Sequence, residues 1–397
     1  MRPPALPLLL ALNLGMGCAT YVVLALGQQR WTASGWSAGE IGLAVAAAMA
    51  AYAVAVAAGG RLAERAGRAR TAIIGCAVAL AGAGFPLADG GPWAPAIGFV
   101  VVNFGCALFF PANAGLFSDA EGAAGSGAIP LHRKVSRYNL GWSGGNLAGF
   151  AIALGIAGIA LHTGAGERWG FAVPVAILAA MIAVLWPWRA LPPLPPPPAG
   201  DRAPHPALPG LTLIGRGALL LACLFGMAVL ALGQQALAGL GEGAGVAARS
   251  LWLGYAVGYV GMFVLFGAWT GWILRPWRLL ALQLALPAAA AGYLAVGLGW
   301  LPQHAATVGL IGVVQGIGYG AVYTGSIYYS LRLPDGASRA AGLHETALGV
   351  GSVIGPLAAG ALLPLLGGGM AGLGWWGLAV SALVIGLQLA AIPRLPR

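Results

Sequence analysis

Apolar residues along this chain of 397 residues come in continuous runs, separated by short segments that contain charged residues, proline or glycine. Runs of about 20 residues can cross the roughly 30 Å of a bilayer's hydrocarbon core as helices, and their continuity argues against the alternating strands of a β-barrel. Twelve spans are predicted: 6–26, 41–59, 71–88, 95–115, 137–161, 169–188, 211–232, 249–269, 279–298, 305–327, 341–364 and 373–392.

A proline-rich segment, 189–210, separates the sixth span from the seventh and contains nine of the 27 prolines. Such a composition favours a stiff, extended linker, which we expect in the cytoplasm. It divides the chain into an N-terminal six-helix bundle, 1–188, and a C-terminal six-helix bundle, 211–397. The predicted fold class is an all-α membrane protein with 12 transmembrane helices in two pseudo-symmetric bundles.

Composition agrees with this prediction. Hydrophobic residues make up 59% of the chain and charged residues 8%, whereas a soluble domain has about 25% charged residues. A soluble globular enzyme is therefore excluded. The cysteines fall inside predicted spans without paired spacing, so neither a disulfide framework, a metal site nor a cofactor is predicted: Cys18, Cys76, Cys106 and Cys223.

Basic residues gather at one set of helix ends. With the N-terminus inside, 17 of the 20 lie on the cytoplasmic side and only Arg30, Arg168 and Arg249 lie outside, which matches the positive-inside rule. The net charge of +10 is thus explained by topology rather than by nucleic-acid binding. We expect a multi-pass protein of a bacterial inner membrane with both termini cytoplasmic and an uncleaved first helix.

An internal repeat relates the two halves. The string Leu-Ala-Leu-Gly-Gln-Gln occurs at 24–29 and again at 230–235, an offset of 206 residues. Two six-helix halves in parallel order would produce this pattern, and a chance match in a chain rich in Ala, Leu and Gly is the alternative. The same offset relates the fifth span to the eleventh by two glycine pairs: Gly145 with Gly351, and Gly149 with Gly355.

Residues 60–70, between the second and third spans, read G-R-L-A-E-R-A-G-R-A-R. This resembles the signature loop of the major facilitator superfamily, G-x-L-A-D-R-x-G-R followed by basic residues. Two departures are Glu64, where the family prefers Asp, and Ala69, which interrupts the basic pair. With the twelve-span pattern, the resemblance covers the whole chain and implies the fold and the transport function of that family.

In that family the loop latches the two halves on the cytoplasmic side. Its acid would face the start of the eleventh span, around Gly342 and Leu343, and its arginine would meet Asp119 or Glu121 at the end of the fourth. Two glycines would permit a tight turn. An Arg-rich loop that merely sets topology is the alternative. The resemblance implies a gating role for Gly60, Glu64, Arg65, Gly67, Arg68 and Asp119.

The segment 351–356 on the eleventh span resembles the family's G-x-x-x-G-P signature, which is associated with antiport when it lies on the fifth span. The fifth span here lacks the proline, and the arginine that many family antiporters carry in the fourth span is also missing. Antiport is therefore not supported, and close helix packing is the better interpretation of these glycines.

Polar residues at helical spacing mark a candidate substrate site, since the family lines its cavity chiefly with spans 1, 4, 7 and 10. Gln315, Tyr319 and Tyr323 stand at i, i+4 and i+8, and such a row is expected to face a cavity or a partner. Interhelical hydrogen bonding is the alternative for any single residue. The other candidates are Asn13, Tyr21 and Gln28; Asn103 and Asn113; Asn139, Trp142 and Asn146; and Tyr255 and Tyr259 on the eighth span.

No charged residue lies near the middle of a predicted span, so a neutral or weakly charged solute is expected. Ionisable groups lie nearer the cytoplasmic ends, at Arg137, Arg216, His344 and Glu345. His344 and Glu345 are the proton-coupling candidates, because a carboxylate there could alternate between protonated and ion-paired states. Capping of the eleventh span is the alternative for Glu345.

We therefore expect a monomeric secondary transporter that moves a small solute by alternating access, with the lipid bilayer and protons as its other partners. One alternative is a non-transport protein of the same fold that acts as a sensor or assembly partner. The other, an integral membrane enzyme, would require clustered His, Asp or Cys residues near one interface, and the five histidines are scattered along the chain.

Overall fold

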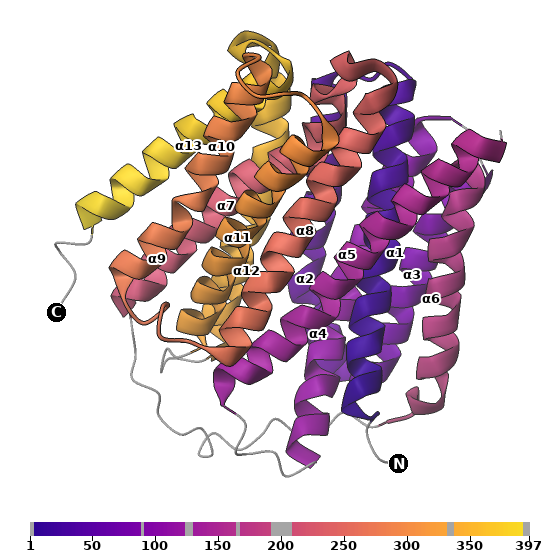
Figure 1. Ribbon diagram of the computed structural model, residues 1–397. Helices are drawn as coiled ribbons and strands as arrows, with labels where there is room; N and C mark the ends of the chain where they lie inside the picture. Colours follow the sequence, from indigo (N-terminus) through magenta and orange to yellow (C-terminus); the bar gives the residue numbers. More distant parts are fainter. Residues whose placement is uncertain are drawn as a thin grey trace. The chain divides into compact units, whose positions relative to one another are not determined.

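A computed structural model describes residues 4–88, 91–123, 130–163, 167–191, 209–331 and 337–391 (Figure 1). These residues form helices and turns, with no strand among them. The first half of the chain contains α1 (Leu6–Ala33), α2 (Ala38–Ala66), α3 (Arg68–Ala88), α4 (Trp93–Ala123), α5 (Leu131–Thr163), the 3-10 helix η1 (Glu167–Phe171), α6 (Ala172–Leu185) and η2 (Trp186–Trp188).

The second half repeats this order with one additional break. It contains α7 (Pro209–Ala236), η3 (Ala238–Gly243), α8 (Ala244–Ala268), α9 (Pro276–Gln283), α10 (Ala285–Gly297), α11 (Ala305–Ser330), α12 (Ala337–Leu362), η4 (Leu363–Leu366) and α13 (Gly369–Ala391).

Twelve segments of these helices are long and apolar enough to cross a membrane, and each overlaps one predicted span. The all-helical, multi-pass fold class is thus confirmed. Several helices are longer than predicted. For example, α5 begins at Leu131 rather than 137, since the helix continues through charged residues that an apolar-run criterion excludes.

The ninth span is not one continuous helix. It consists of α9 and α10, which meet at Leu284. Pro287 explains the break, because proline has no N–H to donate to the carbonyl of Gln283 four residues earlier, and its ring crowds that carbonyl. The helical hydrogen bonds resume with the Ala288 N–H, which donates to the Leu284 carbonyl at 3.0 Å.

The chain divides into two compact units. Unit 1 comprises Met1–Arg30, Ala47–Pro130 and Arg137–Ala203, and unit 2 comprises Trp31–Ala46, Leu131–Ser136 and Pro204–Arg397. The predicted bundles, 1–188 and 211–397, remain a prediction. Most of the predicted linker, 192–208, lies outside the described residues.

In unit 1, α3 and α4 pack through reciprocal glycines. A Cβ built on Gly75 would lie 2.7 Å from the Gly105 carbonyl oxygen, and one built on Gly82 would lie 2.7 Å from that of Gly98. The two helices run antiparallel, and the two glycine pairs are spaced seven residues apart on each helix, so the backbones touch at both pairs. Small residues are what allow helices to approach so closely in a membrane.

In unit 2, the closest helix pair is α8 and α11. A Cβ on Gly258 would collide with the Val313 carbonyl, and one on Gly316 would collide with the Tyr255 carbonyl. The backbones of the two helices therefore touch along a glycine seam, which consists of Gly254, Gly258, Gly312, Gly316 and Gly320.

The internal repeat is visible in how α1 packs on α5 in unit 1 and α7 packs on α12 in unit 2. In each unit, two glycines of the later helix lie against carbonyls of the earlier one. Every residue in one set of contacts is 206 positions from its counterpart in the other, so the repeat extends from sequence to packing. The contacts are Gly145 with Leu14 and Gly149 with Cys18, then Gly351 with Leu220 and Gly355 with Leu224.

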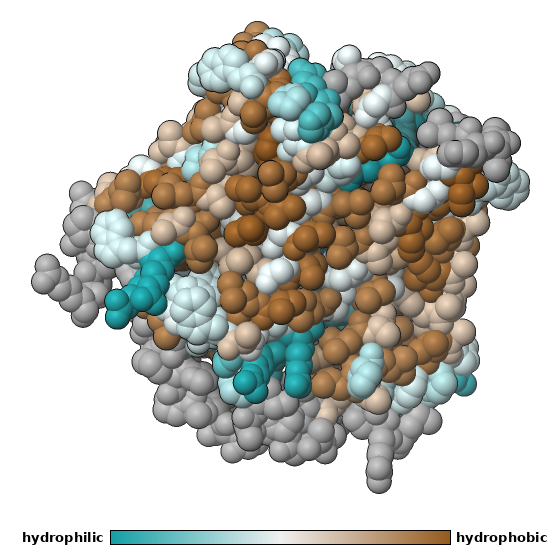
Figure 2. Space-filling view, viewed as in Figure 1, coloured by the Kyte–Doolittle hydropathy of each residue, from teal (hydrophilic) through white to brown (hydrophobic). Residues whose placement is uncertain are grey.

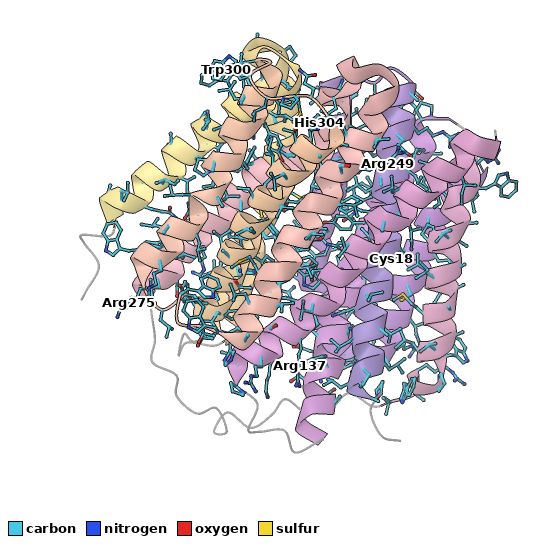
Figure 3. All side chains as sticks on the ribbon, viewed as in Figure 1. Cys18, Arg137, Arg249, Arg275, Trp300 and His304 are labelled. Atoms are coloured by element: carbon cyan, nitrogen blue, oxygen red, sulfur yellow. The ribbon has the colours of Figure 1, made fainter. Side chains whose placement is uncertain are left out.

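The surface of the helices fits a lipid environment. Large apolar side chains are exposed along their sides, including those of Val257, Leu310 and Leu383. Figure 2 shows hydrophobic residues over the sides of the helices and hydrophilic residues concentrated toward their ends. In unit 2, Arg275 and Trp300 lie at opposite ends of the helices (Figure 3).

Candidate functional site

Unit 1 contains a hydrogen-bonded pair of buried asparagines that joins α1, α4 and α5. Asn113 Nδ2 donates to Asn13 Oδ1 at 2.7 Å and to the Leu9 carbonyl at 3.2 Å, and Asn13 Nδ2 donates to the Tyr138 carbonyl at 3.5 Å. Both asparagines are 0% exposed. The predicted face of the first span therefore meets that of the fourth, through neutral amides only.

The remaining candidates on α5 lie against α1. A Cβ on Gly17 would be 2.5 Å from the Trp142 carbonyl oxygen and 2.8 Å from Asn146 Oδ1. Trp142 Nε1 donates to Asn139 Oδ1 at 3.1 Å. Asn139 Nδ2 is buried and has no partner among the described residues, so both hydrogens of this amide remain available as donors.

Three further candidates of unit 1 differ in what they contact. Asn103 Nδ2 donates to the Phe99 carbonyl of its own helix at 2.9 Å, which makes Asn103 the weakest of the set. Tyr21 is half-buried and meets Phe150 edge-on, with ring centroids 4.8 Å apart. Gln28 is buried near the end of α1.

The asparagine pair gives a testable prediction. Asn13→Leu and Asn113→Leu should each lower the free energy of unfolding. The decrease in the double variant should be smaller than the sum of the two single decreases by about 0.6–1.7 kcal/mol, because both single variants remove the same hydrogen bond. Equilibrium unfolding of the four proteins in detergent measures this coupling energy. Asn103→Leu, combined with Asn13→Leu, is the control and should be additive. A coupling near zero for the first cycle would show that the two amides act independently.

Unit 2 brings the predicted row of α11 against the tyrosines of α8. Tyr319 lies 5.5 Å from Tyr255 and 5.9 Å from Tyr259 between ring centroids, and Tyr323 lies 5.9 Å from Tyr319. The glycine seam makes this possible, since the helix backbones touch and the tyrosines of both helices lie side by side. We call these four tyrosines together with Phe263, 5.7 Å from Tyr323, the aromatic row.

Gln315 begins the α11 row and is 0% exposed. Its Oε1 accepts a hydrogen bond of 2.5 Å from the hydroxyl of Tyr293 on α10. Its Nε2 has no partner among the described residues. Tyr293 thus orients the amide and leaves its donor atom available, near the point where Gly226 of α7 passes the Tyr255 hydroxyl.

His344 lies beside the other end of the row. Its ring meets that of Tyr323 edge-on at 5.1 Å, and its Nδ1 lies 2.9 Å from Ser326 Oγ. His344 is 0% exposed, and its Nε2 has no partner within the described part of the chain. Arg216 of α7 is close enough to interact electrostatically with the ring, and Glu345 is half-buried.

The repeat aligns these two sets of residues. With the offset of 206, Asn113 of unit 1 corresponds to Tyr319 of unit 2, and Tyr138 corresponds to His344. The first of these pairs joins two candidate groups of different chemistry, because Asn113 is an amide and Tyr319 is aromatic.

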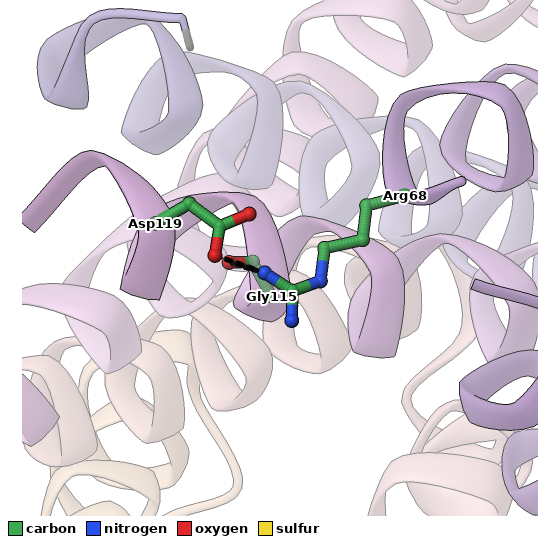
Figure 4. A network of polar contacts seen from close by, with 3 residues as sticks. All are labelled: Arg68, Gly115 and Asp119. Carbon is green, nitrogen blue, oxygen red and sulfur yellow. Dashed lines mark hydrogen bonds and ion pairs between the residues drawn. The ribbon is translucent and has the colours of Figure 1, made fainter. Parts of the chain in front are cut away.

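The predicted gating loop is a turn of a single residue. Gly67 separates α2 from α3 with φ of +94°, a left-handed conformation that favours glycine, and its carbonyl accepts the Thr71 N–H at 3.0 Å. Arg68 then begins α3 and forms an ion pair with Asp119 of α4 (Figure 4). Arg68 Nη1 also donates to the Gly115 carbonyl at 3.0 Å.

The expectation that both glycines of this motif form the turn is wrong for Gly60. Gly60 lies inside α2, which continues to Ala66, because Arg61 to Arg65 are mostly good helix formers. Glu64 and Arg65 are exposed on this last part of α2. The proposed contact of Glu64 with the start of the eleventh span remains a prediction.

Two acids, Asp119 and Glu121, were predicted as partners of the loop arginine. In the structure Arg68 pairs with Asp119, and the side chain of Glu121 lies outside the described part of the chain. Both members of the ion pair belong to unit 1. The pair therefore fixes the α2–α3 turn to the end of α4.

Three further residues received no site role in the sequence analysis. Arg249, which the charge count assigned to the outer side, is buried within α8, where it is 5% exposed (Figure 3). Ser326 continues the spacing of the α11 row by one more turn, a signal that was available in the sequence. Tyr293 reaches Gln315 from another helix, and nothing in the local pattern indicated that contact.

Among the described residues, no three His, Cys, Asp or Glu side chains lie close enough to hold a metal ion. The four cysteines are free and buried, in agreement with their placement inside spans.

Known proteins share the sequence pattern and the fold of this chain. Residues 3–356 match the family model described as Major Facilitator Superfamily. Among solved structures, the nucleoside transporter NupG is similar with a TM-score of 0.66 and 12% identity, over 98% of this chain and 98% of that one. No curated protein matches the sequence.

A bacterial homologue of the human lysosomal transporter Spinster is similar as well. Its inward-facing, unoccupied structure gives a TM-score of 0.66 with 15% identity, over 97% of this chain and 95% of that one. The occupied form gives 0.63 with 17% identity, over 98% and 92%. At these identities the likeness concerns the fold.

Proposed function

This chain belongs to the major facilitator superfamily and is a secondary membrane transporter rather than an enzyme, and we propose that it moves a small neutral or weakly charged solute by alternating access. The observation that carries this proposal is the character of the candidate groups. Asn13 and Asn113 in unit 1 and Gln315 in unit 2 are fully buried, uncharged amides at helical positions that the family uses for its cavity.

A doubly charged solute would need fixed counter-charges, and these candidate groups supply none. A buried anion is stabilised by paired, charge-assisted hydrogen bonds, usually from arginine. In the described helices these charges lie away from the middle of the spans: Arg30 and Arg65 are in the last turns of α1 and α2, and Arg216 and Arg249 are near the starts of α7 and α8. Amides and tyrosines instead provide directional hydrogen bonds to hydroxyl, carbonyl or ring-nitrogen groups.

We propose that both termini lie on the cytoplasmic side of a bacterial inner membrane. The twelve candidate spans of the described residues would leave the two termini on one side, and the excess of basic residues on that side supports this orientation. We propose that the protein works there as a monomer. A reporter that is active only in the periplasm, fused after residue 397, should stay inactive, and an active fusion would contradict the orientation.

Proton coupling is proposed at His344 and Glu345 on α12. Arg216 and Cys223 of α7, together with Tyr323 and Ser326 of α11, are the groups that surround them, so a proton gained or lost there changes a local charge balance. Movement of the helices could then favour the protonated form in one conformation and the ion-paired form in the other.

Glu345→Gln should remove the dependence of uptake on a proton gradient while leaving exchange of solute across the membrane intact, because the neutral amide mimics the protonated acid. Uptake into proteoliposomes with and without an imposed pH gradient measures this. Glu40→Gln, at the exposed start of α2, is the matched control. Gradient-driven uptake that survives in Glu345→Gln would exclude the coupling role.

A thermal-shift screen of the purified protein, followed by proteoliposome uptake of each stabilising solute, tests the central proposal. Neutral solutes should raise the melting temperature and dianions should not. Nucleosides belong in the panel, since a structurally similar protein is a nucleoside transporter. Binding without uptake would favour a sensor of the same fold. Preferential binding and uptake of a sugar phosphate would contradict the proposal that the solute is neutral or weakly charged.

A further inference from the structure

The aromatic row presents a continuous hydrocarbon surface from α8 and α11. Ring centroids of successive members lie 5.1 to 5.9 Å apart, from Tyr255 through Tyr259 and Tyr319 to Tyr323. The planes meet at 36° to 74°, so the rings touch through tilted or edge contacts rather than covering one another's faces. Tyr319 is half-buried, while its three tyrosine neighbours in the row are buried.

A second observation lies at the same place. Gln315, one turn before Tyr319, is fully buried with its Nε2 unpartnered among the described residues. A buried donor without a partner destabilises the unoccupied site, so a ligand that accepts this hydrogen bond would relieve that cost. Because Tyr293 holds Oε1, the amide presents its donor in one orientation.

We propose that the aromatic row and Gln315 form a binding surface for a planar aromatic or heteroaromatic solute that is neutral and bears a hydrogen-bond acceptor such as a carbonyl. Tyr319 contacts the ring, and Gln315 Nε2 donates to the acceptor. This proposal rests on the proposed transport of a neutral solute and narrows its class. The equivalent position in unit 1 is Asn113, so the aromatic contact belongs to one half of the repeat only.

Three probes separate the two contacts. Benzamide has a ring and a carbonyl, cyclohexanecarboxamide has the carbonyl without the aromatic ring, and indole has the ring system without a carbonyl. Each is titrated into the purified, full-length protein in detergent, and the melting temperature gives an apparent affinity. Benzamide should bind more tightly than cyclohexanecarboxamide. Equal binding of this pair would overturn the proposal, because the two probes share the carboxamide and differ in the aromatic ring.

Substitutions assign the contacts. Tyr319→Leu should weaken benzamide binding roughly tenfold, and Tyr319→Phe, which keeps the ring, should weaken it much less. Gln315→Met should weaken the binding of benzamide but leave the binding of indole unchanged, because indole has no carbonyl to accept the Gln315 hydrogen bond. If Tyr319→Leu and Gln315→Met both bind benzamide as the unmodified protein does, the site lies elsewhere.

A glycine variant tests the same place without removing a polar group. A Cβ on Gly226 would lie 3.2 Å from the Tyr255 hydroxyl and 3.7 Å from Gln315 Nε2, so Gly226→Ala places a methyl group beside the proposed donor and should weaken benzamide binding. Gly261→Ala on α8 is the matched control, since nothing lies within 4 Å of its Cβ. Unchanged binding by Gly226→Ala would count against the assigned donor.

Uptake into proteoliposomes distinguishes this proposal from the one on which it rests. Uptake of benzamide that falls in Tyr319→Leu would support both. Saturable uptake of a sugar or polyol that is unaffected by Tyr319→Leu would overturn the proposal of an aromatic solute, while the proposed transport of a neutral solute would still hold. Uptake of no neutral solute would overturn both.

Discussion

Gly316→Leu is expected to yield no folded protein, and Gly316→Ala is expected to lose about 1–3 kcal/mol of stability or more. A Cβ at this position collides with the Tyr255 carbonyl and lies 3.0 Å from the Gly258 Cα, and neither backbone can move without separating α8 from α11. Close approach of the backbones is the basis of this helix pair, because apolar side chains gain little from association in lipid. Size-exclusion chromatography and thermal unfolding of the purified variants measure the effect.

The control for this prediction is Gly261→Ala, which lies on α8 outside the glycine seam and should unfold like the unmodified protein. Gly316→Ala should also weaken binding of any ligand at the aromatic row, since α8 and α11 place the tyrosines relative to one another. A Gly316→Ala protein with unchanged stability would show that the two helices are less closely packed than described.

Arg68→Ala is expected to slow transport about tenfold, equivalent to about 1.4 kcal/mol, with a smaller loss of stability. The Arg68 and Asp119 side chains are 21% and 15% exposed, so the ion pair is screened less than a surface pair, and its loss leaves a partly buried carboxylate alone. The turn at Gly67 would then be held less firmly to α4. Initial uptake rates in proteoliposomes, normalised to reconstituted protein, test the prediction.

The reversed pair, Arg68→Asp with Asp119→Arg, should recover part of the lost rate, because the charges remain complementary. Arg68→Lys should be intermediate, since one ammonium group does not reproduce the geometry that serves both Asp119 and the Gly115 carbonyl. Arg70→Ala, at an exposed position in the same basic cluster, is the control. If Arg70→Ala slows transport as much as Arg68→Ala does, general positive charge rather than the ion pair is what matters.

The row of α11 shows which parts of the site could be predicted. Gln315, Tyr319 and Tyr323 share a helix face by spacing alone, and the structure places Tyr255 and Tyr259 beside them. The Tyr293 hydroxyl on Gln315 could not be predicted, because it depends on how α10 packs and rotates after the break at Leu284. Asp119 and Glu121 were equivalent by sequence until the position of Arg68 on α3 selected Asp119.

By itself, the sequence determined the quantities that depend on local composition: twelve spans, their repeat at 206 residues and the polar faces on individual helices. A bilayer imposes a fixed length and apolar character on each span, so these features are properties of single segments. Which faces meet was decided only by the tertiary structure, as in the contact of Asn13 with Asn113, the seam around Gly316 and the burial of Arg249. Those contacts depend on close packing between segments far apart in the chain, which periodicity does not encode.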